Sequence, residues 1–258
     1  MQTLIIIQPL HRMGEAMSQN SEIAEKLRGI LRLRYEPVAV KLIRPGEALP
    51  EGYVIPDHNI SHCQSIMRAR KGEKLLLPAE KHSCPAGGSA LGVMETPTKI
   101  QTGEFHYRIG MFETQEAAKA MIDARTEMGE EIAATMVAPL AEADFEPDAV
   151  VIVDMPERLY WLVAATTYMT GGRVPMSTAA FQATCVDATI IPIVEQRINF
   201  SMGCYGCRRR TDISLDEMIV GIPNAKLPKL VEALEKIAVG PMEKVVKDGT
   251  RDYIIIKV

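Results

Sequence analysis

Hydrophobic residues recur along the chain in two patterns, one helical and one typical of buried strands. Ile23, Leu27, Ile30 and Leu31 fall at helical spacing within residues 21–34, which predicts an amphipathic helix. Near-continuous apolar runs at 38–43 and 149–153 predict strands buried on both faces. By the same criteria we expect further helices at 61–70, 86–92, 115–137, 156–169, 185–193 and 225–238, and further strands at 74–77, 171–176, 198–202, 218–222 and 253–258.

This alternation predicts the α/β fold class, with mixed sheets flanked by helices in one compact domain. We expect the domain to cover residues 17–258. Residues 1–16 are interpreted as an N-terminal extension, either disordered or the product of a mis-assigned start codon, because Met17 is followed by Ser18 and Asn20, which can cap a helix.

Two similar segment orders suggest an internal duplication. The segment 71–78 leads to Cys84 and the segment 171–176 leads to Cys185, and an apolar helix is predicted after each cysteine. Further on, 109–112 is similar to 220–223. We expect two related halves at about 17–137 and 138–258, with Cys84 and Cys185 in related positions near the junction. The alternative is that strand–turn–helix units resemble one another by chance.

Composition narrows the class of protein. Of 258 residues, 47% are hydrophobic and 24% are charged, as in an ordinary globular protein. A net charge of −4 and 5% aromatics argue against a nucleic-acid partner. No apolar run approaches the ~20 residues that span a bilayer, and no signal peptide is evident. We therefore expect a cytoplasmic protein without membrane contact. Tyr160, Trp161 and Tyr168 suit the interface of a homo-oligomer.

The chain has five cysteines, an odd number, without a sign of export. In a reducing compartment such residues are metal ligands, reactive thiols or buried apolar groups before they are disulfides. Cys63, Cys84 and Cys185 each lie where a predicted helix begins, and Cys204 and Cys207 form a Cys-x-x-Cys loop. A helix N-terminus favours the thiolate that a metal needs.

Four thiolates suffice for a [4Fe–4S] cluster, a [2Fe–2S] cluster or a zinc ion. The spacing matches neither a ferredoxin nor a zinc ribbon, so we expect a site assembled by the whole fold. The spacing alone leaves open which four of the five cysteines are the ligands. The alternative interpretation is a set of buried free thiols plus one redox pair, Cys204 and Cys207.

Polar neighbours of the cysteines complete the candidate site. His62 and His82 lie within two residues of a cysteine, where they suit hydrogen bonding to ligands or a place at the surface. Gly203 lets backbone amides approach sulfur. Arg208 can offset the negative charge of a cluster, or bind an anionic ligand or an acidic partner.

Several motifs together resemble the "domain of unknown function 169" family. They are His62-Cys63-Gln64, Lys71-Gly72-Glu73, the run from His82 to Gly88, the run from Met202 to Arg208, and Gly221-Ile222-Pro223 with Glu217 ahead of it. The resemblance covers about residues 20–240. This family is common in archaea and anaerobic bacteria, which implies a setting where an oxygen-sensitive cluster survives. Its pattern maps onto Cys63, Cys84, Cys204 and Cys185, and is more permissive at Cys207. The resemblance therefore implies Cys63, Cys84, Cys185 and Cys204 as the ligands, with Cys207 as an alternate ligand.

Three functional hypotheses follow. The first is a [4Fe–4S] protein that transfers electrons or binds a substrate at the cluster, with an electron-transfer protein or a small anionic ligand as partner. The second is a thiol/disulfide protein that uses Cys204 and Cys207. The third is a zinc-stabilised binding module. The sequence names no reaction, so it leaves open whether the protein is an enzyme.

Overall fold

The computed structural model describes residues 10–237. Its α-helices are α1 Leu10–Leu31, α2 His62–Ala69, α3 Pro85–Ala90, α4 Thr98–Gln101, α5 Glu104–Arg108, α6 Gln115–Asp123, α7 Pro156–Thr167, α8 Ile191–Glu195, α9 Tyr205–Arg210 and α10 Leu227–Lys236. A π-helix covers Ala183–Ile190, and short 3₁₀ turns cover Ala79–Lys81, Leu140–Glu142 and Asn224–Lys226. The strands are β1 Val38–Ile43, β2 Leu75–Pro78, β3 Ala134–Pro139, β4 Ala149–Asp154, β5 Asn199–Ser201 and β6 Met218–Pro223.

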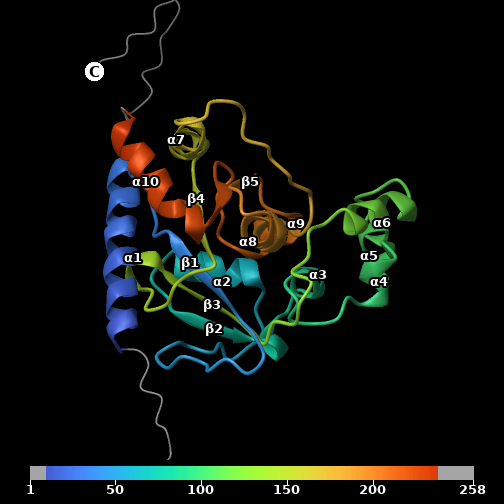
Figure 1. The fold of residues 1–258 in the computed structure, drawn as a ribbon. Coiled ribbons are helices and arrows are strands. Elements are labelled where there is room, and N and C mark those ends of the chain that lie inside the picture. The colour runs from blue at the N-terminus through green and yellow to red at the C-terminus, as the bar shows by residue number, and fades with distance from the viewer. Residues whose placement is uncertain (1–9, 238–258) are drawn as a thin grey trace, which may run out of the picture.

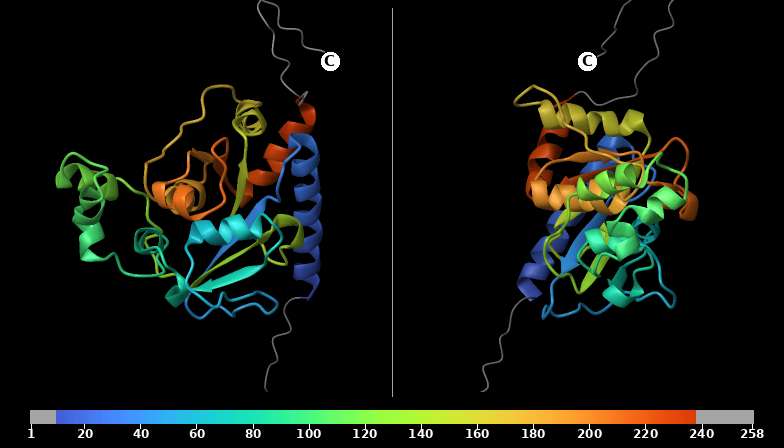
Figure 2. Two further views of the ribbon diagram at one scale, coloured as in Figure 1. Left: turned by 180° about the vertical axis from the view of Figure 1, so that it is seen from behind. Right: turned by 90° about the vertical axis from the view of Figure 1, so that its right-hand side faces the viewer.

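Within this range the strands form one six-stranded sheet in the order β2-β3-β1-β4-β6-β5. Because side chains alternate between the faces of a strand, the sheet divides the core in two. Ala39 and Val150 face a layer of α1, α7 and α10, and Figure 1 shows α1 and α10 side by side on that face. Val38 and Val151 face α2, the π-helix and the end of α3. Helices α4–α6 project beyond α3, as the left view of Figure 2 shows.

The two halves of the sheet, β2-β3-β1 and β4-β6-β5, pair their strands in the same register. Val38, the first residue of β1, pairs with Pro139 at the end of β3. In the same way Ala149, the first residue of β4, pairs with Pro223 at the end of β6. Each of these prolines is followed by a 3₁₀ turn.

The outer strands continue the same correspondence. Leu75 of β2 pairs with Val137 in β3, and Asn199 of β5 pairs with Gly221 in β6. Val137 and Gly221 hold equivalent places in their strands. At the centre, β1 and β4 pair antiparallel about Ala39 and Val150. The sheet therefore has a pseudo-twofold axis between β1 and β4.

This symmetry relates the cysteines differently from the sequence-based expectation. Cys63 lies in α2 before β2, and Cys185 lies in the π-helix before β5. Cys84 and Cys204 each immediately precede the helix that follows β2 or β5. The topology thus matches Cys63 with Cys185 and Cys84 with Cys204, not Cys84 with Cys185. The first structural half ends and the second begins within residues 143–148. The boundary expected near residue 137 lies inside β3.

The α/β fold and its single domain agree with the sequence analysis, but several elements differ. The predicted helix 115–137 ends at Asp123, because Ala134–Pro139 forms β3, a fully buried strand between β2 and β1. No strand forms at 171–176. The pairings of the sheet are antiparallel throughout rather than mixed. Helix α1 begins at Leu10, inside the segment interpreted as an extension. The predicted strand 253–258 lies outside the described residues.

Candidate metal centre

All five cysteines line one cavity of about 680 Å³ on the α2 face of the sheet. They come from α2, the loop before α3, the π-helix and the loop around α9, which are far apart in sequence. The fold therefore brings together Cys63, Cys84, Cys185, Cys204 and Cys207, the residues that the sequence analysis selected. The side chains that surround them decide what the group can bind.

Cys63 is fixed by the start of α2. The Gln64 side chain accepts a hydrogen bond from the backbone N–H of Ser61 at 2.9 Å, which sets the first turn of the helix. The Ser61 hydroxyl lies 3.1 Å from the Cys63 sulfur. The same hydroxyl donates its proton to Oε1 of Gln64 at 2.9 Å.

Cys84 and Cys185 meet across Gly87. Pro85 begins α3 directly after Cys84, which fixes the backbone where the thiol projects. A Cβ atom on Gly87 would lie 3.0 Å from the Cys185 sulfur and 3.5 Å from the Cys84 sulfur. The missing side chain therefore leaves the space that these two thiols share.

Cys204 and Cys207 lie at the start of α9. Gly203 adopts φ 78°, a left-handed conformation that glycine reaches without strain, and so turns the chain into Cys204. The backbone N–H of Cys207 donates to the Cys204 sulfur at 3.3 Å. Arg208 holds the loop closed by donating to the carbonyl oxygens of Met202, Ser214 and Glu217.

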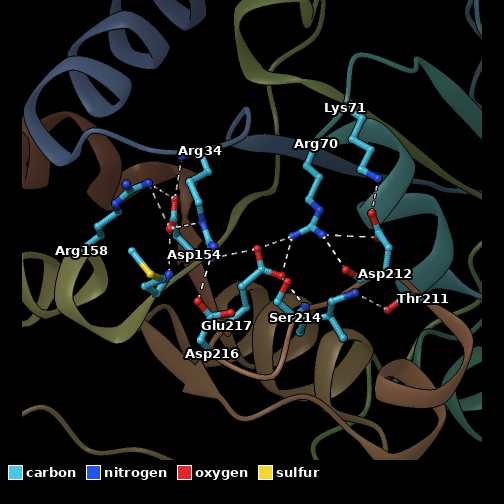
Figure 3. Close-up of polar contacts among 12 residues, drawn as sticks. Arg34, Arg70, Lys71, Asp154, Arg158, Thr211, Asp212, Ser214, Asp216 and Glu217 are labelled. Atoms are coloured by element: carbon cyan, nitrogen blue, oxygen red, sulfur yellow. Dashed lines mark hydrogen bonds and ion pairs between the residues drawn. The ribbon is translucent and has the colours of Figure 1, made fainter.

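A buried ion network anchors this loop to the rest of the domain (Figure 3). Arg70 at the end of α2 donates to Glu217 at 3.0 Å, and both side chains are 1% exposed. Glu217 also accepts from Arg34, which in turn binds Asp154 at the end of β4. On the other side Arg70 binds Asp212. These contacts join α2, β4 and the segment after α9, and they fix where Cys204 and Cys207 sit relative to Cys63.

The π-helix that carries Cys185 is held by Asp187. Its carboxylate accepts hydrogen bonds from Thr178 and Ser201, each at 2.8 Å. Asn199 of β5 donates to the Asp187 carbonyl oxygen at 2.9 Å. Burial raises the pKa of Asp187 to about 7. A π-helix is rare and occurs often at functional sites, and here it places Cys185 at the cavity.

The thiols differ in their protonation. A hydrogen bond between Cys63 and Cys207 lowers the pKa of Cys207 and, with burial, raises the pKa of Cys63 well above its usual value. Burial raises the pKa of Cys185 and of Cys204. Cys63, Cys185 and Cys204 therefore do not ionise readily by themselves, whereas metal binding displaces their protons.

The two predicted histidines have different places. His62 lines the cavity, and its Nε2 bonds the Thr189 hydroxyl at 2.9 Å. Burial lowers the pKa of His62 to about 3, so its ring is neutral at neutral pH. His82 does not line the cavity; its Nε2 bonds Thr135 in β3, and burial lowers its pKa to about 4.

The cavity lining is rich in sulfur, and no carboxylate from the described part of the chain belongs to it. Its charged members are Arg209 and Arg210. Among residues 10–237 no three His, Cys, Asp or Glu side chains are grouped closely enough to hold one metal ion. The four thiolates of a [4Fe–4S] cluster each bind a different iron, and so are spaced more widely than the ligands of one ion. The thiols of this lining are the ligand type that such a cluster takes.

Sequence reasoning missed several other residues of the cavity. Gln182, Phe181, Phe105, His106 and Tyr205 line it beside the cysteines. None of them lies in a recognisable motif apart from Tyr205 in the Cys-x-x-Cys loop. No sequence signal marks Gln182, because its position depends on how the 170–182 segment returns to the π-helix.

Comparison with known proteins places the chain among uncharacterised relatives. An uncharacterized protein of Methanocaldococcus jannaschii, MJ0308, is 38% identical over 216 residues, which cover 83% of this chain and 93% of the relative. No solved structure matches. Among the described helices, none is long and apolar enough to cross a membrane. The model of the DUF169 family, described as "Uncharacterised ArCR", matches residues 26–233, and the chain therefore belongs to this family.

Proposed function

We propose that this protein binds a [4Fe–4S] cluster through Cys63, Cys84, Cys185 and Cys204, and that it uses the cluster to transfer electrons or to bind a substrate. The observation that carries the proposal is the convergence of cysteines from four separate segments on one cavity. Bound there, the cluster would supply one-electron chemistry or, once one of the four thiolates is displaced, an iron that accepts a ligand.

The pseudo-twofold arrangement supports this choice of ligands. It groups Cys63 with Cys185 and Cys84 with Cys204 as equivalent positions. Cys207 has no counterpart, because no second cysteine follows Cys84 in α3. Four thiols in symmetry-related positions and one thiol without a counterpart agree with a site of four ligands to which Cys207 is an additional thiol.

The surroundings are suited to a negatively charged group. The N–H of Cys207 donates to the Cys204 sulfur, and a hydrogen bond of this kind raises the reduction potential of a cluster. Arg209 and Arg210 offset its charge, and no carboxylate from the described residues opposes them in the lining. A redox protein or a small anionic ligand is the corresponding partner.

Metal analysis of anaerobically purified protein tests the proposal. We expect brown protein that contains iron and acid-labile sulfide in equal amounts. Cys63→Ala, Cys84→Ala, Cys185→Ala and Cys204→Ala should each lose the iron, because each removes a ligand. Cys207→Ala is the matched control, since it removes a thiol from the same cavity and should keep the iron.

Other outcomes would replace the proposal. Full iron in Cys84→Ala would show that the ligand set is wrong. Colourless protein with stoichiometric zinc would support a zinc-stabilised binding module instead. Colourless, metal-free protein in which Cys204 and Cys207 titrate as a redox pair would support a thiol/disulfide protein.

A further inference from the structure

Unpartnered polar atoms are concentrated around the cysteine cavity. Buried polar side chains almost always have a hydrogen-bond partner. Within residues 10–237, six buried side-chain nitrogen or oxygen atoms have none, and four of them belong to residues that line this cavity. They are Nδ1 of His62, Nδ1 of His106, and both amide atoms of Gln182. Gln182 is 5% exposed and His106 is 1% exposed.

The backbone of Gln182 is in the left-handed region, and no helix end at this position explains it. Arg32, Gln182 and Gln196 are the non-glycine residues with positive φ in the described chain. Arg32 follows α1, and Gln196 ends α8, and left-handed residues are common after helices. Gln182 instead precedes the π-helix with φ 59° and ψ 39°. Strain of this kind clusters at functional sites, and here it holds a free amide at the cavity.

The walls of the cavity are aromatic. His106 packs on Phe105 and Phe181 with ring centroids 5.2 and 4.5 Å apart, and Tyr205 lies 6.1 Å from Phe181. Phe105 and Tyr205 are 46% and 41% exposed, so their rings remain available for stacking. Arg209 lies against Tyr205, with its guanidinium 5.2 Å from the ring centroid.

The size of the cavity allows a small molecule. Its volume of about 680 Å³ falls within the roughly 300–1,000 Å³ of ligand sites. Such sites are mainly apolar, with a few polar groups that orient the ligand. The unpartnered amide and imidazole are polar groups of this kind, and neither belongs to a proposed cluster ligand.

We propose that this cavity binds a planar heterocycle with a lactam edge and an anionic substituent. A lactam offers one N–H and one C=O side by side, which are the partners that Oε1 and Nε2 of Gln182 lack. Phe105 and Tyr205 stack on the ring, and Nδ1 of His106 bonds a further ring atom. Arg209 and Arg210 bind the anion. This proposal goes beyond cluster binding, because its residues are not cluster ligands.

Calorimetric titration of the anaerobically purified protein tests the inference with two lactam probes. Flavin mononucleotide has a three-ring system, and guanosine 5′-monophosphate has a two-ring system. We expect saturable binding of at least one of them. The control ligand is 1-naphthyl phosphate, which keeps a planar ring and a phosphate but has no lactam, and it should bind about tenfold or more weakly because two hydrogen bonds are missing.

Variants of the protein test the assigned residues. Gln182→Gly removes the amide and relieves the backbone strain, and should weaken probe binding about tenfold or more. His106→Phe keeps a ring on Phe181 and should weaken it by a smaller factor. Gln196→Gly is the matched control: it is a left-handed glutamine with an exposed side chain, outside the cavity, and it should bind as the wild type does.

Several results would overturn the inference. They are the absence of binding of both probes, equal affinity for 1-naphthyl phosphate, unchanged affinity in Gln182→Gly, or an equal loss in Gln196→Gly. Iron content measured on the same samples separates this test from that of the cluster. Gln182→Gly should keep its iron while it loses the probe, and an iron-free wild type that still binds a probe would refute only the cluster.

Discussion

At the scale of single residues, the space between two of the cavity's thiols depends on a glycine, Gly87. Gly87 lies where Cys84 and Cys185 approach each other, and its φ is not in the left-handed region. Its backbone conformation is therefore open to any residue, and space is what requires glycine there. A methyl group would occupy the volume between the two sulfurs.

We predict that Gly87→Ala lowers the iron content sharply. The added Cβ would lie 3.0 Å from the Cys185 sulfur, so at least one thiol must move away from the site. Iron and sulfide per chain, measured beside wild-type protein, check this.

Gly29→Ala is the matched control. Gly29 also lies in a helix, α1, and nothing lies within 4 Å of its added Cβ. This change should leave the iron unchanged and stabilise the fold by about 0.5–1 kcal/mol, as alanine does for glycine in a helix. Normal iron in Gly87→Ala would show that the space beside Gly87 is not part of the site.

At the scale of elements, the backbone of the π-helix packs directly against the backbone of β6. A Cβ on Gly221 would lie 2.1 Å from the carbonyl oxygen of Ala188. The contact is backbone to backbone, so no side chain can turn aside to relieve it. Glycine in the middle of this strand is thus explained by the close approach of the helix that carries Cys185.

We predict that Gly221→Ala destabilises the protein by at least about 1–3 kcal/mol, the usual cost of overpacking a core. The midpoint of urea unfolding, followed by circular dichroism, measures this change. The loss should be accompanied by a weaker iron site, because the π-helix must shift. An unchanged midpoint would contradict the close packing of these two elements.

Most elements could be predicted from apolar periodicity, and the failures have physical causes. Helix α10 and strand β4 follow their patterns closely. The segment 115–137 was misassigned because Met136 and Val137 can continue a helical face as well as form a strand. Sheet pairing with β1 and β2 decides between the two, and that pairing is not encoded in the local pattern.

At the scale of the whole molecule, an ion network connects the two halves. Arg34 and Arg70 come from the first half, and Asp154 and Glu217 come from the second. Removing one member of a buried ion pair leaves the other charge without compensation in a medium of low polarity. The network is therefore a sensitive point of the fold.

We predict that Glu217→Ala destabilises the protein by about 3–5 kcal/mol, because Arg70 loses its buried partner. Urea unfolding measures the effect. Glu232→Ala is the matched control, since its ion pair with Lys236 is exposed on α10, and it should leave the unfolding midpoint where it is. Equal effects of the two changes would mean that the buried network adds nothing to stability.

The chemistry of the candidate site was contained in the sequence, but its arrangement was not. Residue types alone selected the five cysteines and His62, and all of them line the cavity. His82 was selected on the same grounds and bonds Thr135 outside the lining. Proximity in sequence to a cysteine does not fix the direction of a side chain.

The sequence by itself determined the α/β class, most of the elements and the set of thiols, because these follow from local periodicity and residue chemistry. The tertiary structure alone decided the antiparallel order of the strands, the correspondence of Cys63 with Cys185 and of Cys84 with Cys204, and the place of Gln182 and His106 beside them. These depend on contacts between residues far apart in the chain. Such contacts are selected by the packing of two layers on one sheet, which no local pattern records.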